Sequence, residues 1–383
     1  MMAPGKGRFY LPQLDGLRFF AFLLVFFSHF RWVPPSIARI PGVGWLLREL
    51  HRHGGLGVDL FLVLSAYLIT TLLLIEHKKL GRISLKFFYI RRTLRIWPLY
   101  YFILALSVLV LPVLQGVWST AQHQDVLGTH GVFSTFFLAN IAELFTDVAV
   151  PKRIGHLWTI SLEEQFYVVW PAMLVVLLKR PKLIPAALLS AFALSVATRA
   201  LVVSAEMQVA IWKFTLTHLD PFALGSLLAL YRFKHPGNGQ HSGLRFLLGI
   251  GLILFTTRFP RPRDETMHVV WTYAVVALGF TFIIDGILDS SHKWFCRFLS
   301  WGPFVWLGQI SYGLYVYHLV GIEAGTEIGY ALGASLETTR GWLVHCAVNL
   351  GLIVGFSYVS FVLLEKPFMR MKKRFALVAS RDT

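Results

Sequence analysis

Cysteine and charge are both scarce in this sequence, and each scarcity restricts what the protein is. Only Cys296 and Cys346 occur among 383 residues, which excludes a disulfide framework and a CxxC metal site. Charged residues make up 15% of the chain and 56% is hydrophobic, as in proteins with several membrane-spanning helices. Short connections join the apolar runs and leave no room for a separate soluble domain, and no repeat or low-complexity segment is present. We therefore expect one integral membrane domain over residues 1–383.

The formal net charge of +16 would suggest a nucleic-acid partner in a soluble protein. Here the basic residues lie in loops between apolar runs, where the positive-inside rule explains them, so we expect the lipid bilayer and no nucleic acid as partner. The first apolar run is longer than the core of a signal peptide and lacks a small-residue cleavage site after it. We expect this run to stay as a span of a multi-pass protein in the cell membrane, the inner one if the source is bacterial.

The distribution of Lys and Arg also predicts the topology. Apolar runs long enough for helices begin near Leu14, Val58, Trp97, Gly131, Ser161, Leu183, Val209, Leu244, His268, Trp301 and Arg340. If the short and polar run from residue 131 does not cross, the basic segments 76–95, 179–182, 232–235 and 365–375 all face the cytoplasm. We expect an all-α bundle of about ten spans with both termini cytoplasmic, and a re-entrant or surface element at residues 131–157 on the outer side.

The first apolar run carries Arg18 near one end and His29 near the other. An ionisable group inside a membrane helix costs roughly 2.5–3.5 kcal/mol on insertion scales, so such groups tend to be functional. Because the two residues are eleven positions apart, a helix places both on one face, about 16 Å apart along its axis. We expect this face to contact two parts of a long substrate. The alternative is a boundary ion pair between Asp15 and Arg18, with His29 snorkelling to the far surface.

The second run opens with a glycine cluster and then places Asp59 just inside the membrane. Gly54, Gly55 and Gly57 allow close backbone approach, which favours helix packing over ligand binding. The carboxylate of Asp59 is suited to orient or charge His29 on a neighbouring helix, and capping of its own helix is the alternative.

Three arginines, Arg91, Arg92 and Arg95, lie on consecutive turns at the cytoplasmic entrance of a helix that continues past Pro98. Guanidinium groups match the geometry of phosphate oxygens, so we expect these side chains to bind the phosphates of a cytosolic donor such as coenzyme A. Anchoring to anionic lipid is the alternative.

The stretch from residue 156 to 171 places Ser161, Glu163, Glu164 and Gln165 together as it enters a membrane helix. Two adjacent carboxylates with an amide are costly there, so we expect a general base or a binding site for a hydroxyl-rich acceptor on the outer side. A capping hydroxyl with a following glutamate would explain one carboxylate but not both.

Two later runs contain single polar groups, Asp220 and His318. We expect both to contribute to the substrate site. For His318, an imidazole satisfied by helix packing is an equal alternative. The tyrosines near it, Tyr312, Tyr315 and Tyr317, are expected to serve as aromatic packing.

In their order along nearly the whole chain, these stretches resemble the acyltransferase-3 family of multi-pass membrane O-acyltransferases. The resemblance rests on Arg18 and His29 with ten residues between them, GVDLFLVLSAYLI (57–69), RRTLRIWPLY (91–100), WTISLEEQFY (158–167), DPFALGS (220–226) and the SYGLYVYH run that ends at His318.

The resemblance implies transfer of an acyl group, most often acetyl, from cytosolic acyl-coenzyme A to a hydroxyl of an extracytoplasmic carbohydrate, glycolipid or related acceptor. The family's functional pair falls on Arg18 and His29, and its arginines after the second helix fall on Arg91, Arg92 and Arg95. No metal is implied.

The sequence departs from the family in two ways. Ala66 stands where the family usually has glycine, and the additional C-terminal hydrolase-like domain of many members does not follow the last run. We expect the reaction to be completed inside the membrane domain or with a partner.

A second class of function uses the same residues. A transporter or flippase of a sugar or lipid would employ Arg18, His29 and Asp220 as a proton or anion relay. The arginine cluster favours the enzyme, because a proton-coupled carrier does not need it. The acceptor, the acyl length, the role of His29 as base or acyl carrier, and a homo-oligomeric state stay open.

Overall fold

The computed structural model describes residues 10–30, 32–237, 240–259, 267–289, 294–375 and 377. Every regular element in these ranges is helical, which confirms the all-α prediction. In the described part of the chain, six helical segments are long and apolar enough to cross a bilayer: Val43–Leu80, Leu85–Leu114, Lys152–Leu177, Leu183–Ser204, Val269–Leu288 and Thr339–Phe375. The ten spans and the side of each terminus stay predictions, and residues 1–9 lie outside the described ranges.

The described residues form two compact units. The first unit contains residues 59–296 and the C-terminal segment from residue 368. Its longer helices are most of α4 (Gly57–Leu80), α5 (Leu85–Ala105), α10 (Leu157–Leu177), α11 (Leu183–Ser204), α13 (Leu219–Lys234), α14 (Ser242–Thr256) and α15 (Val269–Leu288). Its shorter elements are η2 (Leu106–Val110), α6 (Leu111–Leu114), α7 (Ala121–Val126), η3 (Leu127–Gly131), α8 (Val132–Thr135), α9 (Ala139–Phe145), η4 (Lys152–Ile154), α12 (Gln208–Lys213), η5 (Thr215–His218) and η7 (Lys373–Phe375).

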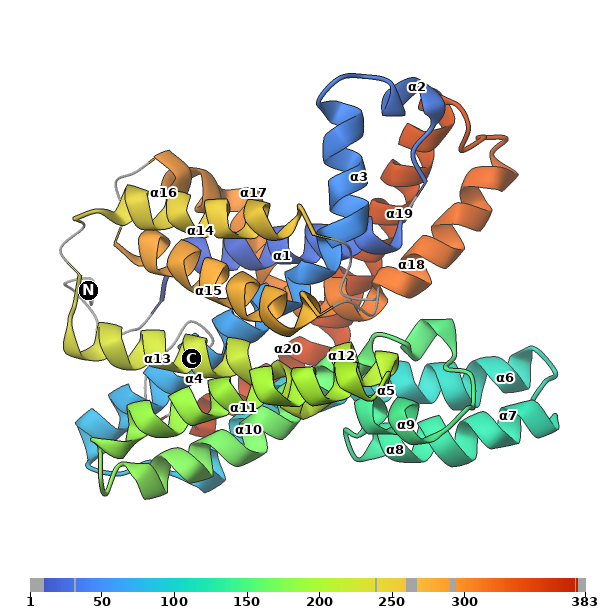
Figure 1. Cartoon of the computed structure of the whole chain (residues 1–383). Coiled ribbons are helices and arrows are strands. Elements are labelled where there is room, and N and C mark those ends of the chain that lie inside the picture. Colours follow the sequence, from blue (N-terminus) through green and yellow to red (C-terminus); the bar gives the residue numbers. More distant parts are fainter. Residues whose placement is uncertain are drawn as a thin grey trace. The chain divides into compact units, whose positions relative to one another are not determined.

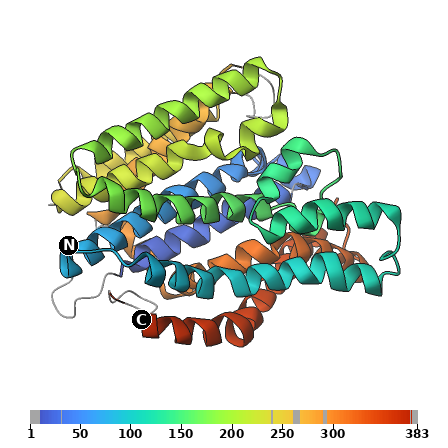
Figure 2. The ribbon, with the colours of Figure 1, turned by 90° about the horizontal axis from the view of Figure 1, so that it is seen from below.

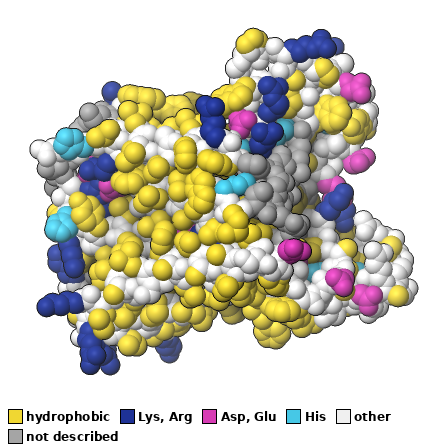
Figure 3. Space-filling model, in the orientation of Figure 1, with side chains coloured by type: hydrophobic (Ala, Val, Ile, Leu, Met, Phe, Trp, Pro, Cys, Tyr) yellow, Lys and Arg dark blue, Asp and Glu magenta, His cyan; other side chains and the backbone are white. Residues whose placement is uncertain are grey.

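Two pairings within the first unit are plain in the ribbon views. Helices α14 and α15 lie side by side (Figure 1), where Gly249 and Gly279 let the two backbones approach closely. Helix α5 continues through η2 into α6 as one helical segment, and α7 runs back beside the end of this segment (Figures 1 and 2). Hydrophobic side chains cover much of the face of this unit in Figure 3, with Lys and Arg gathered near the left edge, as expected of helices surrounded by lipid.

Residue 152 already belongs to the helical segment Lys152–Leu177, which is long enough to span, and the described residues between 131 and 151 form only the short helices α8 and α9. Neither of these two has the length that a span requires. The expectation that residues 131–157 do not cross the membrane, and their re-entrant or surface placement, stay predictions, because residues 152–157 open a segment that is long enough to span.

Two of the expected apolar runs are each divided between two helices. The run from Val209 forms α12 and α13 with the short element η5 between them, and α12 ends just before Phe214, whose backbone is extended. The run from Trp301 forms α17 and α18, which meet at Ile310. Continuous apolarity in the sequence therefore does not imply one continuous helix.

The second unit consists of residues 12–58 and 297–367. Its elements are α1 (Pro12–His29), α2 (Pro35–Ala38), α3 (Val43–His53), η1 (Gly54–Leu56), α17 (Gly302–Gln309), α18 (Ser311–Ala331), α19 (Thr339–Ser360) and η6 (Phe361–Glu365). Helices α16 (Trp294–Leu299) and α20 (Lys366–Lys372) each have residues in both units.

Glycines set the packing of α18 against α19 in the second unit. A Cβ atom on Gly321, Gly325 or Gly329 would run into side chains of α19. These three positions are four residues apart and form one ridge, the small-residue pattern by which membrane helices pack closely. The pair positions His318, which lies one turn before Gly321 on α18.

Candidate active site

His29 is the last residue of α1, and its side chain is exposed. Its Nδ1 atom lies 3.0 Å from the carbonyl oxygen of Val25 and 3.1 Å from Oγ of Ser28. A carbonyl can only accept a hydrogen bond, so Nδ1 carries the proton and donates it to Val25. The neutral ring then has its basic lone pair on Nε2. The carboxyl end of a helix also stabilises positive charge, which suits a group that gains a proton.

His318 on α18 lies beside His29, with ring centroids 4.8 Å apart and an interplanar angle of 66°. The His318 side chain is fully buried, and its Nδ1 lies 2.5 Å from the carbonyl oxygen of Tyr315. By the same argument, Nδ1 of His318 is a donor and Nε2 holds its lone pair. Two residues that the sequence predicted separately, 289 positions apart, therefore form one imidazole pair within the second unit.

The carboxyl-terminal half of α1 packs tightly against the glycine cluster. A Cβ on Gly54 would run into the carbonyl oxygen of Leu24 and come within 3.1 Å of the Ser28 Cβ. A Cβ on Gly57 would run into the carbonyl oxygen of Ala21, whereas Gly55 has open space around it. The packing interpretation is confirmed for Gly54 and Gly57, which hold the helix just before His29.

Arg18 lies on α1 as predicted, and its Nη1 is 3.7 Å from Oδ1 of Asp15. The ion pair of the alternative interpretation is thus present. This ion pair does not exclude a functional role for Arg18, because 23% of the Arg18 side chain is exposed, against 6% of the Asp15 side chain. The expected role of Arg18 toward the substrate stays a prediction.

Arg91 and Arg92 of α5 have different surroundings within the first unit, and the predicted role of Arg95 stays a prediction. Arg91 forms a 3.0 Å ion pair with the buried Glu76 and donates a 2.8 Å bond to the carbonyl oxygen of Phe375. The guanidinium of Arg92 lies over the rings of Phe88 and Tyr167, at 5.7 and 5.4 Å. Arg91 therefore has a structural role that the sequence did not predict.

Glu164 lies against α5. Its Oε2 accepts a 3.1 Å bond from the indole of Trp97, and its side chain is buried. Trp97 is twelve residues into α5, about 18 Å along the helix from its first residue, so Glu164 lies well inside the helix packing. Oε1 of Glu164 has no hydrogen-bond partner among the described residues, which leaves this oxygen able to accept a proton or a hydroxyl donor.

The capping explanation for this stretch is wrong. Helix α10 begins after His156, and no side chain caps its first turn. The hydroxyl groups of Thr159 and Ser161 instead donate to the carbonyl oxygens of His156 and Leu157.

Gln165, predicted to bind substrate, joins α10 to the neighbouring short elements. Its amide nitrogen donates to the carbonyl of Phe137 and to Oδ1 of Asn140, each at 2.9 Å. Its Oε1 accepts a 2.5 Å bond from Thr215. These contacts give Gln165 a structural role, and substrate contact by Gln165 and Ser161 stays a prediction.

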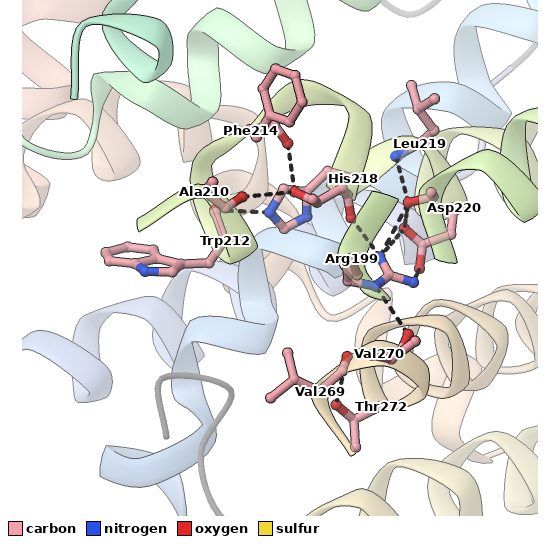
Figure 4. A network of polar contacts seen from close by, with 12 residues as sticks. Arg199, Ala210, Trp212, Phe214, His218, Leu219, Asp220, Val269, Val270 and Thr272 are labelled. Atoms are coloured by element: carbon pink, nitrogen blue, oxygen red, sulfur yellow. Dashed lines mark hydrogen bonds and ion pairs between the residues drawn. The ribbon is translucent and has the colours of Figure 1, made fainter. Parts of the chain in front are cut away.

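Asp220 is not a single polar group inside a span. Both of its carboxylate oxygens accept 3.0 Å bonds from the guanidinium of Arg199, and both side chains have zero exposure (Figure 4). Ser195 donates a 2.9 Å bond to the same carboxylate, and the guanidinium also donates to the carbonyls of Thr217 and Val270. Asp220 is therefore the buried partner of Arg199, and its substrate role stays a prediction.

Sequence reasoning missed Arg199, although a signal was present. Arg199 is the one charged residue of α11, and Asp220 lies in the next apolar run. Two opposite charges in neighbouring membrane helices predict an ion pair, because either charge alone is costly in the bilayer. Asp59 is also buried and interacts electrostatically with this pair. Its expected role toward His29 stays a prediction.

Comparison of the sequence with known proteins shows which family it matches. The sequence model of the acyltransferase-3 family, described as an acyltransferase domain, matches residues 11–362. The peptidoglycan O-acetyltransferase OatA of Listeria monocytogenes is 27% identical over 390 residues, covering 95% of this chain and 56% of OatA. YrhL of Bacillus subtilis is 27% identical over 349 residues, covering 83% of this chain and 50% of YrhL. The chain thus spans about half the length of these relatives. No solved structure matches it.

Proposed function

This chain belongs to the acyltransferase-3 family, and we propose on that basis that it is a multi-pass membrane O-acyltransferase with His29 at its reaction centre. The proposed donor is cytosolic acyl-coenzyme A, with acetyl as the group transferred. The proposed acceptor is a hydroxyl of an extracytoplasmic carbohydrate. Peptidoglycan is the first acceptor to test, because the relative OatA is named for it.

The observation that carries the proposal is the tautomer and placement of His29. Its Nδ1 is engaged by Val25, and its Nε2 holds the lone pair that either acyl-transfer route requires. The second imidazole, His318, lies beside it and provides a polar wall next to the reacting group.

Two routes use this lone pair. In the base route, Nε2 removes the proton from the acceptor hydroxyl, the alkoxide attacks the thioester carbonyl, and the coenzyme A thiolate leaves and takes up that proton. In the relay route, Nε2 attacks the thioester carbonyl first and the thiolate leaves. The acceptor hydroxyl then attacks the acyl-imidazole, which releases the ester and restores the neutral histidine, and the hydroxyl proton passes to the coenzyme A thiolate.

The relay route predicts that purified protein becomes labelled by radioactive acetyl-coenzyme A with no acceptor present. The label is expected on His29, and mass spectrometry of the digested protein locates it. Cys296 is a poor competitor, because burial raises the pKa of its thiol to about 11. Label on His29 that passes to added acceptor supports the relay, and absence of label during full turnover supports the base.

The donor site is tested through the arginines of α5. Changing Arg92 or Arg95 to alanine is expected to raise KM for acetyl-coenzyme A about tenfold with kcat changed less than about threefold, because each removes one cation from the phosphates. Arg91→Ala is expected to lower thermal stability as well, because it leaves the buried Glu76 carboxylate without its cation. Steady-state kinetics in nanodiscs measure the constants, with the exposed Arg82→Ala as control.

The whole proposal is tested by acetyl transfer from radiolabelled acetyl-coenzyme A with the purified chain in nanodiscs. Turnover that depends on the protein supports the enzyme. If the chain neither binds nor consumes acyl-coenzyme A but carries a sugar or lipid across vesicle membranes, the transporter alternative replaces it.

A further inference from the structure

Two indole groups bond the chain that follows His29 to the segment around the start of α19 in the second unit. The Nε1–H of Trp342 on α19 donates a 2.6 Å bond to the carbonyl oxygen of Trp32. In return, the Nε1–H of Trp32 donates a 2.6 Å bond to the carbonyl oxygen of Leu336. The two bonds cross between the same pair of segments, so each restrains the other's geometry.

Further contacts join the same two segments. Ser36 and Thr339 share a 2.7 Å hydrogen bond between their hydroxyl groups. The ring of Phe30, directly after His29, lies 6.5 Å from the ring of Trp342 at an interplanar angle of 30°. Both of these aromatic side chains are buried.

The segment around Trp342 is itself held in place. Thr338 caps the first turn of α19 by accepting a 3.0 Å bond from the backbone nitrogen of Gly341. A Cβ on Gly341 would run into the carbonyl oxygen of Ser335, so this turn is closely packed. Trp342 is therefore held in place by its own helix, whereas the described residues between α1 and α2, 30 and 32–34, belong to no helix.

His29 ends its helix, where backbone restraint is weakest. The last carbonyl groups of a helix lack intrahelical partners and the final turn frays readily. The glycine cluster restrains α1 on the side before His29. The Trp342 bond to Trp32 restrains the chain three residues after it. Small displacements of a catalytic group lower rates strongly, so this second restraint matters for chemistry.

We propose that Trp342 is a positioning residue for His29: its indole N–H holds the chain after α1 so that the His29 ring stays against His318. The inference rests on the proposed role of His29. It assigns to Trp342 an effect on the rate of acyl transfer and none on donor binding, since Trp342 acts through the backbone of Trp32.

The test compares Trp342→Phe with the unchanged chain in nanodiscs. Phenylalanine keeps a ring next to Phe30 but removes the N–H donor. We expect kcat to fall about tenfold while KM for acetyl-coenzyme A stays within about twofold. Trp32→Phe removes the reciprocal bond and should give a similar loss, and the double variant should lose less than the product of the two single effects, because both bonds hold one segment.

A readout independent of turnover separates this inference from the proposed function. Diethyl pyrocarbonate modifies imidazole nitrogens, and mass spectrometry reports its rate at His29. We expect that rate to rise at least about threefold in Trp342→Phe and Trp32→Phe, whether or not acetyl-coenzyme A proves to be the donor. The control is Trp306→Phe on α17, whose indole is 41% exposed and packs on Tyr358.

An unchanged kcat and an unchanged modification rate at His29 in Trp342→Phe would overturn the positioning role. So would a loss of kcat that is matched by a rise in KM and a fall in melting temperature, because that pattern indicates general destabilisation. A wild-type chain that consumes no acyl-coenzyme A contradicts the proposed function alone, and the modification rates at His29 still decide the role of Trp342.

Discussion

Replacing His29 with alanine is expected to reduce acetyl transfer on the order of 10³-fold, with donor binding retained. The reduction follows from the loss of Nε2, which either takes the proton or carries the acyl group, and a positioned acid or base contributes about 10²- to 10⁴-fold. Radiolabelled acetyl-coenzyme A measures transfer in nanodiscs, and calorimetry measures binding. The backbone should be unaffected, because His29 is exposed at the end of its helix.

His235→Ala serves as the matched control, because His235 is also exposed and lies just past a helix end. It should leave transfer unchanged. His318→Ala is expected to lower kcat less than His29→Ala, since His318 supports the reacting ring from the side. Full activity of His29→Ala would remove the first helix from the chemistry and overturn the proposed mechanism.

Replacing Arg199 with methionine is expected to lower the free energy of unfolding by about 3–5 kcal/mol, because it leaves a buried carboxylate without its cation. The pair has zero exposure, and all of its bonds in Figure 4 are internal. Thermal and denaturant unfolding in detergent measure the effect. The double variant Arg199→Met with Asp220→Leu should recover part of the loss, since it removes both charges together.

The exposed Arg180→Met on the loop after α10 is the control and should change stability little. The same series decides between the two interpretations of Asp220. If Asp220→Asn keeps wild-type stability but raises KM for the acceptor, Asp220 contacts substrate as the sequence predicted. If stability falls and KM is unchanged, the carboxylate is a structural partner of Arg199.

The candidate residues could be selected from residue types alone, because the bilayer makes polar groups conspicuous, and their roles stay predictions. Arg18, His29, Glu164 and His318 stand out in apolar runs, where an ionisable group is costly. The same rule also selects residues whose partners are structural. Gln165 forms hydrogen bonds with three residues on two neighbouring segments, and no spacing rule within one helix shows contacts between helices.

The sequence by itself determined that this is an all-helical membrane protein of the acyltransferase-3 family, because apolar length and motif order are local properties of the chain. Only the tertiary structure decided which polar groups meet. It placed His318 against His29, Arg199 against Asp220, and Trp342 against the backbone of Trp32. Each of these contacts joins segments distant in sequence, and helix packing, set in part by glycines that let backbones approach, determines which side chains come together.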